Sequence, residues 1–175
     1  KITILLLIAS SVIFAQKTYV PDDKFEQTLI DLGYDTTLDD SVLTANIRGV
    51  ISLNVGEKEI GDLTGIEAFI SLEELWCYQN KLTSLDLSKN TALKTLECAN
   101  NQLTSLNGLT DKLSTFNATK NPNLTCIEVL DPAWATAKWT SANGNIDSGV
   151  TFTYICGVDV NGVSTYNNNG IKAMT

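Results

Sequence analysis

The sequence contains no histidine among its 175 residues. This absence excludes Ser-His-Asp and Cys-His catalysis, and it excludes every zinc site with an imidazole ligand. Basic residues are also scarce: 12 lysines and arginines stand against 20 aspartates and glutamates, for a formal net charge of −8. Nucleic acids and anionic membrane surfaces attract basic patches, which an acidic chain lacks. We therefore expect neither partner, and no residue pattern predicts a cofactor or a metal site.

Long apolar runs are absent apart from the segment Ile2–Ala15, which follows the positive residue Lys1. A positive residue, a short apolar core and small residues before Gln16 predict a secretory signal peptide over residues 1–15, cut near Ala15/Gln16. The run is too short for a comfortable membrane span, so membrane insertion is not expected. A buried N-terminal helix is the alternative. The signal predicts a secreted or cell-surface protein, and the length of 175 residues is enough for one domain.

A leucine pattern repeats itself between Leu72 and Leu103. The pattern is L-x-x-L-x-C-x-x-N-x-L, and its second copy starts 21 residues after the first (93 − 72 = 21). A decayed copy precedes it at residues 50–60, and another follows at residues 113–121. A period in the twenties with this leucine pattern is typical of a leucine-rich-repeat solenoid. Each unit also contains a half-length echo, carried in the first unit by Leu82, Leu85, Leu87 and Asn90.

The spacing inside one unit predicts its conformation. From Glu74 to Tyr78, apolar and polar positions alternate as in a strand with one inward face. Stacked units would form a parallel ladder of such strands, about 4.8 Å apart. The asparagine that follows each strand can satisfy backbone groups left unpaired by the turn. Asn80, Asn101 and Asn121 therefore predict a structural asparagine ladder, the alternative being ordinary surface polar residues.

The four cysteines fall into two kinds. Cys77 and Cys98 share one repeat position, which places them inward on neighbouring coils at a spacing wider than the roughly 3.8 Å between disulfide Cβ atoms. We expect both to be reduced and structural, because cysteine packs as a small hydrophobe. Cys126 and Cys156 lie outside the regular repeats, and in an exported protein they predict a disulfide.

Residues 16–49 have the composition of an N-terminal cap, which a solenoid needs to cover its first coil. A helix is predicted from Lys24 to Leu32, with Asp22 or Asp23 at its start and Gly33 at its end. A second segment from Asp39 to Ala45 is predicted to be helical or irregular. The local acidic residues lack the order of an EF-hand calcium loop, so helix capping and surface charge are favoured over a calcium site.

The repeats are predicted over residues 50–125 and a C-terminal cap over residues 126–156. Strands are expected at Cys126–Val129 and Val150–Ile155, and a short helix begins with Asp131 as its cap and Pro132 at its first position. Trp134 and Trp139 are expected to cover the last coil, a carbohydrate platform being the alternative. Residues 157–175, rich in Gly, Asn, Ser and Thr, are predicted to be a linker or a truncated tail.

The units resemble the nested 21-residue bacterial leucine-rich repeats called IRREKO-type. Asn80–Leu93, with the text NKLTSLDLSKNTAL, is similar to arrays in secreted proteins of flavobacteria and other Bacteroidetes. Tyr19–Asp23, Leu63–Glu67 and Asn121–Ile127 resemble the flanking caps of that group. The resemblance implies a non-catalytic binding module. Many such proteins carry a C-terminal sorting domain, which is not recognisable in this sequence.

The predicted fold is an α/β solenoid, mostly β, with a right-handed coil, a helical N-terminal cap and a disulfide-bearing C-terminal cap. The outer side of its strand ladder is the best candidate binding surface. Trp76 and Tyr78 stand out there as predicted exposed aromatics, which favour binding hot spots. The alternative is that they shield the flank of the array against the N-terminal cap. The predicted face consists of Glu74, Trp76, Tyr78, Thr95, Glu97 and Asn117, with Ser52, Asn54 and Thr119 nearby.

Glu74 and Glu97 can be considered as a carboxylate pair for glycoside cleavage. Nothing in the sequence indicates a deep pocket, so ordinary acidic surface residues are the favoured interpretation. The leading hypothesis is therefore a secreted or surface-displayed module that binds a protein or peptide. A glycan-binding or substrate-targeting module of a larger exported protein is the alternative, followed by a structural spacer and, last, an enzyme.

Overall fold

The computed structural model describes residues 15–156, 165–166 and 172–173. Almost all of the expected signal peptide, and all of the expected tail apart from β11 (Thr165–Tyr166) and β12 (Lys172–Ala173), lie outside the described residues. The two short strands β11 and β12 pair antiparallel. Within the described part of the chain, no helix has the length and apolar character to cross a membrane.

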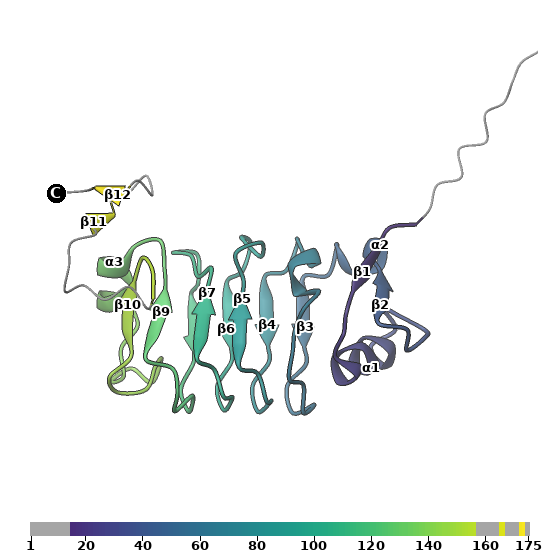
Figure 1. The fold of residues 1–175 in the computed structure, drawn as a ribbon, viewed down its shortest axis with the longest axis horizontal. Helices are drawn as coiled ribbons and strands as arrows, with labels where there is room; N and C mark the ends of the chain where they lie inside the picture. The colour runs from purple at the N-terminus through teal and green to yellow at the C-terminus, as the bar shows by residue number, and fades with distance from the viewer. Residues whose placement is uncertain (1–14, 157–164, 167–171, 174–175) are drawn as a thin grey trace, which may run out of the picture.

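A four-stranded parallel sheet runs along the array of repeats. Its strands are β3 (Ser52–Asn54), β4 (Glu74–Trp76), β6 (Thr95–Glu97) and β8 (Thr115–Asn117), in that order. Leu53, Leu75, Leu96 and Phe116 lie in register across the sheet and are buried. Figure 1 shows the coils stacked side by side along the long axis of the molecule. The predicted solenoid with a parallel strand ladder is confirmed.

The half-length echo in the sequence corresponds to a second strand in the coils that contain β4 and β6. β5 (Ser84–Asp86) and β7 (Ser105–Asn107) form a separate two-stranded parallel sheet. Leu85 and Leu106 are paired and buried, whereas the flanking Ser84 and Ser105 are exposed. Both halves of a repeat therefore turn their leucines into one continuous core. Each fully buried leucine contributes roughly 1.5–3 kcal/mol relative to an exposed one.

The N-terminal cap is built around α1 (Asp23–Asp31). Asp22 begins it, since its side chain accepts hydrogen bonds from the backbone N–H groups of Lys24 and Phe25. The helix ends before Gly33, whose φ of +81° is the left-handed conformation typical of a helix terminus. Phe25 and Leu29 are fully buried, and the Phe25 ring lies 6.4 Å from that of Phe69. The predicted helix is thus observed, shifted by one residue.

The segment after this helix differs from its prediction. β2 (Ser41–Leu43) pairs antiparallel with β1 (Lys17–Tyr19), and α2 (Thr44–Ile47) follows directly. The expectation of a helical or irregular segment over 39–45 was wrong for residues 41–43, because their pairing partner is more than twenty residues away. Fully buried Glu26 also contributes, since its carboxylate accepts the N–H groups of Asp39, Asp40 and Ser41.

The C-terminal end of the array is closed by β9 (Cys126–Glu128), α3 (Pro132–Lys138) and β10 (Thr151–Thr153). β9 pairs parallel with β10, and Asp131 begins α3 by accepting the N–H of Trp134. The predicted Cys126–Cys156 disulfide is confirmed. Trp139 is buried with its ring centroid 4.7 Å from that of Phe116, so it covers the last coil as expected.

Candidate binding site on the strand face

The parallel register assembles the predicted binding residues into rows. One row runs Asn54, Trp76, Glu97 and Asn117, and the next runs Ser52, Glu74, Thr95 and Thr115. Strand alternation turns all of these side chains away from the buried leucines. Glu97 lies directly opposite Trp76, whereas Glu74 lies opposite Thr95. The sheet therefore brings the sequence-predicted residues of three neighbouring coils onto one surface.

Tyr78 is held close to the backbone of the preceding coil. A Cβ atom placed on Gly56 would lie 2.7 Å from ring carbons Cε1 and Cζ of Tyr78, so only glycine leaves room for the ring in its present position. Trp76 and Tyr78 are both half-buried, rather than fully exposed as predicted. Tyr78 lies against Gly56 of the preceding coil, and Trp76 stands in register between Asn54 and Glu97, two arrangements that strand alternation in a single repeat does not show.

A groove of about 500 Å³ separates helix α1 from the first two coils. Thr28, Asp31 and Leu32 line it from the helix, and Asn54, Gly56, Glu57, Lys58 and Tyr78 line it from the coils. The three helix residues lie outside the face predicted from the sequence, because no local pattern places α1 beside Tyr78. One contact that joins the start of α1 to the first coil is Asp22, whose Oδ2 accepts the N–H groups of Gly61 and Asp62 at 2.8 and 3.0 Å.

The charge of the face is negative. Glu74 and Glu97 are half-buried, and the two strand rows contain neither lysine nor arginine. The nearest cation in sequence, Lys94, is exposed immediately before β6, and its Nζ lies 2.7 Å from the Glu73 carboxylate. An acidic surface with partly covered aromatic rings offers hydrogen-bond acceptors, negative potential and apolar contact area to a partner.

The three asparagines of the predicted ladder lie between coils. Asn101 is typical: its Nδ2 donates to the carbonyls of Cys77 and Cys98 at 2.9 and 3.1 Å, and its Oδ1 accepts the Leu82 N–H at 3.1 Å. Asn80 and Asn121 make corresponding bonds to their own coil and to the preceding one. All three side chains are buried. They are occupied by backbone groups and are not free to meet a ligand.

Cys77 and Cys98 are buried free thiols at equivalent positions of neighbouring coils. Burial raises the pKa of Cys77 to about 12, and the negative charge of Glu97 adds to the shift. Burial also raises the pKa of Cys98 well above its usual value, helped by Cys77 and Glu97. A thiol that stays protonated is a poor nucleophile. These cysteines therefore behave as small core residues.

The N-terminal cap contains an acidic cluster whose carboxylates accept hydrogen bonds from neighbouring groups of the cap. Carboxylate oxygens of Glu26, Asp35 and Asp39 lie within 4.8 Å of one another. Glu26 is bound by backbone N–H groups, and Asp39 by Lys17 and Ser41. The hydrogen bond between Lys17 and Asp39 lowers the pKa of Asp39 and raises the pKa of Lys17. The arrangement organises the turn before β2.

Comparison with known proteins places this architecture in a class. Residues 70–111 match the family model described as leucine-rich repeats, two copies. Internalin J of Listeria monocytogenes serotype 4b (strain F2365) is 33% identical over 73 residues, which is 42% of this chain and 8% of that protein. Together with the repeat geometry, these findings support a leucine-rich-repeat protein.

Solved structures agree on the fold. The functional domain of InlJ from Listeria monocytogenes, described as including a cysteine ladder, has a TM-score of 0.52 and 25% identity, and the match covers 83% of this chain and 31% of that chain. An internalin (inlF) from Listeria monocytogenes strain 4b F2365 has a TM-score of 0.52 at 16% identity, covering 77% and 43%, and shows the fold alone. The chain thus spans under half the length of each of these relatives.

Proposed function

We propose that this chain is a secreted or surface-displayed, non-catalytic module that binds a protein or peptide through its strand face. The observation that carries the proposal is the pair of registered rows, in one of which Trp76 lies opposite Glu97. Both side chains are half-buried, whereas the leucines are buried in the core and the ladder asparagines are bound to backbone groups. Leucine-rich-repeat solenoids present such surfaces for extended recognition. The similarity to internalins and the Cys126–Cys156 disulfide support an extracellular setting.

The composition of the face favours a partner with basic and aromatic or aliphatic side chains. Glu74 and Glu97 would pair with cationic groups, while the exposed part of Trp76 would supply a hot spot. The two carboxylates lie on an open sheet rather than in a deep pocket, which favours recognition over catalysis. The InlJ domain is described as including a cysteine ladder, and Cys77 and Cys98 occupy one repeat position on neighbouring coils of this chain. We assign these two thiols to coil stacking rather than to binding.

The proposal is tested with peptides selected against the folded chain from an unbiased display library. Their affinities are measured calorimetrically for the wild type and for Trp76→Ala and Glu97→Gln. We expect Trp76→Ala to weaken binding by roughly 30-fold, the scale of a hot spot. Glu97→Gln should weaken it by several-fold and reduce its salt dependence.

Two matched controls separate the strand face from the rest of the surface. Tyr19→Ala removes an aromatic residue that is 62% exposed and lies outside the two rows. Ser84→Ala alters the separate β5–β7 sheet. Both should leave affinity unchanged. Selected peptides that bind Trp76→Ala and Glu97→Gln as tightly as the wild type would overturn the proposed site.

A further inference from the structure

The repeat pattern breaks where the last coils meet the C-terminal cap. Leu93 follows Leu72 by 21 residues, but Leu113 follows Leu93 by only 20 (113 − 93 = 20). Thr110 stands at the position that Asn90 holds one coil earlier. The Asn90 carbonyl accepts the N–H of Leu93, and the Thr110 carbonyl accepts the N–H of Leu113. Asn90 reaches back to the carbonyls of Ile66 and Phe69, whereas the Thr110 hydroxyl accepts the nearby N–H of Lys112. The buried amide that fills this position one coil earlier is therefore missing here.

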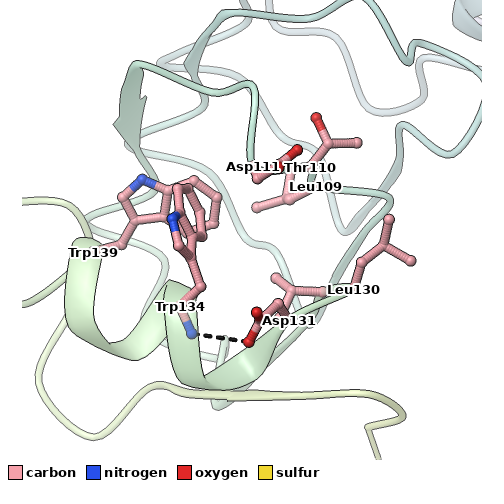
Figure 2. Close-up of a pocket in the computed structure, with 8 residues that line it drawn as sticks. Leu109, Thr110, Asp111, Leu130, Asp131, Trp134 and Trp139 are labelled. Atoms are coloured by element: carbon pink, nitrogen blue, oxygen red, sulfur yellow. Dashed lines mark hydrogen bonds between the residues drawn. The ribbon is translucent and has the colours of Figure 1, made fainter. Parts of the chain in front are cut away.

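A pocket of about 180 Å³ lies beside this break. Figure 2 shows Trp134 and Trp139 on one side, the segment Leu109–Asp111 across from them, and Leu130 and Asp131 along the adjoining edge. Val129 completes the lining. The lining is thus largely aliphatic and aromatic, with carboxylates contributed by Asp111 and Asp131.

The aromatic wall is preorganised by packing. Trp139 is buried between Phe116 and Phe152, with ring centroids 4.7 and 5.8 Å away. Trp134 stands edge-on to Trp139 at 5.0 Å and is only half-buried, so part of its indole remains available. Leu130, at the edge of the pocket, is 79% exposed. A rigid wall lowers the conformational entropy lost when a ligand binds.

The two acidic side chains keep oxygen atoms available. Asp131 uses Oδ1 to accept the Trp134 N–H at 2.9 Å, which holds the carboxylate beside the pocket. Asp111 is exposed. The ion pairs found in the described residues are Lys17–Asp39, Lys81–Glu59 and Lys94–Glu73, and none involves either acid. Lys112 turns away from its neighbour Asp111, since its Nζ donates to the Thr91 carbonyl at 2.9 Å.

We propose that this pocket binds the side chain of a lysine or arginine from a partner polypeptide. The methylene stem would lie against Leu109, Val129 and Leu130, and the charged end would meet Asp111 and Asp131 beside the indole of Trp134. Cations are attracted to the face of an indole, and tryptophan is the best ring for this interaction. The volume is below the roughly 300–1,000 Å³ of drug-sized ligand sites, which fits one inserted side chain. This site is separate from the strand face.

The proposal is tested by titrating the folded, disulfide-bonded chain with acetyl-Gly-Lys-Gly-amide. The neutral control is the same peptide with norleucine, which keeps the stem and lacks the charge. Binding is read from the NMR resonances of the Trp134 indole N–H and the Asp111 backbone N–H. We expect the lysine peptide to shift both and the norleucine peptide to shift them much less. About 1 M salt, where the Debye length is near 3 Å, should weaken the response.

The variants Asp111→Asn and Asp131→Asn remove charge with little change of shape. Asparagine is as good a helix cap as aspartate, so Asp131→Asn should leave α3 intact. Each should weaken lysine-peptide binding about threefold, and Trp134→Leu by a similar factor. Asp86→Asn, in β5 and outside the pocket, is the matched control and should have no effect. Trp76→Ala should also have no effect, which separates this site from the strand face.

Three results would overturn the proposal. Equal shifts with the norleucine peptide would make the pocket an apolar contact site only. Larger shifts with a neutral monosaccharide than with the lysine peptide would make it a sugar site. Unchanged pocket resonances at the highest peptide concentration, while the resonances of the wild-type fold are intact, would show that it takes no cationic side chain.

Discussion

Asp22 and Gly61 are joined by a hydrogen bond of 2.8 Å between positions 39 residues apart. The same carboxylate begins α1 with its other oxygen, so one side chain fixes both the start of the cap helix and its attachment to the first coil. This attachment contributes to the groove beside Tyr78, since the two walls of the groove come from α1 and from the first coils.

Asp22→Ala should therefore lower the free energy of unfolding by about 2–3 kcal/mol. Loss of a helix cap costs about 1 kcal/mol, and each further intramolecular hydrogen bond contributes about 1 kcal/mol. The stability of Asp22→Asn should lie between that of the wild type and that of Asp22→Ala. Its amide oxygen keeps the helix cap, but its NH2 group is a donor and cannot accept the N–H groups of Gly61 and Asp62. Urea denaturation measures the effect. The exposed neighbour Asp23→Asn is the control, and an equal loss there would contradict the assignment.

Asn101→Ala should destabilise the fold by about 3 kcal/mol. It leaves the Leu82 N–H and the Cys77 carbonyl without their partner in a buried site, and each unsatisfied buried group costs about 1–3 kcal/mol. The exposed Asn123→Ala, measured by the same denaturation experiment, should change stability by less than about 0.5 kcal/mol. If the two variants were equally stable, the asparagine ladder would not hold the coils together.

Thiol counting under denaturing, non-reducing conditions should find two free thiols, from Cys77 and Cys98. Replacing Cys126 and Cys156 with serine should cost roughly 3–4 kcal/mol of stability in the chain-entropy model, because the bridge closes a loop with a sequence separation of 30. Reduction of the wild type should reproduce most of this loss. Four free thiols in the oxidised protein would contradict the disulfide.

The stability contributed by Cys77 should depend on alkaline pH. Its folded pKa of about 12 lies above the ordinary value of 9.0, so the folded state keeps a proton that the unfolded state releases. The contribution is fully present below pH 9.0 and declines above it, by at most about 1.4 kcal/mol per pH unit. Unfolding free energies of the wild type and of Cys77→Ala should converge as pH rises above 9.0. Parallel curves would contradict the shift.

Gly56→Ala should displace the Tyr78 ring and destabilise the protein by about 1 kcal/mol, the low end of the usual cost of overpacking, because the half-buried ring can move. The clash disappears in Gly56→Ala/Tyr78→Ala, so the double-mutant cycle should show favourable coupling between the two changes. Gly49→Ala is the control, because a Cβ there meets nothing within 4 Å. Additive effects in the cycle would show that the ring does not depend on Gly56.

The residue pattern was sufficient for the regular part of the array. Leu75 and Leu96 recur at a spacing that stacked parallel strands satisfy, and the half-length echo at Leu85 and Leu106 corresponds to the second pair of strands. The disulfide was also predictable, since Cys126 and Cys156 stand outside the repeat. The binding role of Trp76, Tyr78 and the neighbouring acids stays a prediction, because repeat spacing determines which side chains face outward and not what they bind.

What the sequence by itself determined is everything governed by short, periodic spacing: the inward leucines, the buried cysteines and asparagines, and the turns between strands. Tertiary structure alone decided the rest. It decided that β1 pairs with β2 and that the Glu26 carboxylate binds the turn before β2. It also placed the Tyr78 ring against Gly56 and formed the pocket beside Trp134. Each of these contacts joins residues far apart in the chain or at the end of the repeat. No local period encodes such a contact, because it forms only once the coils and caps have packed together.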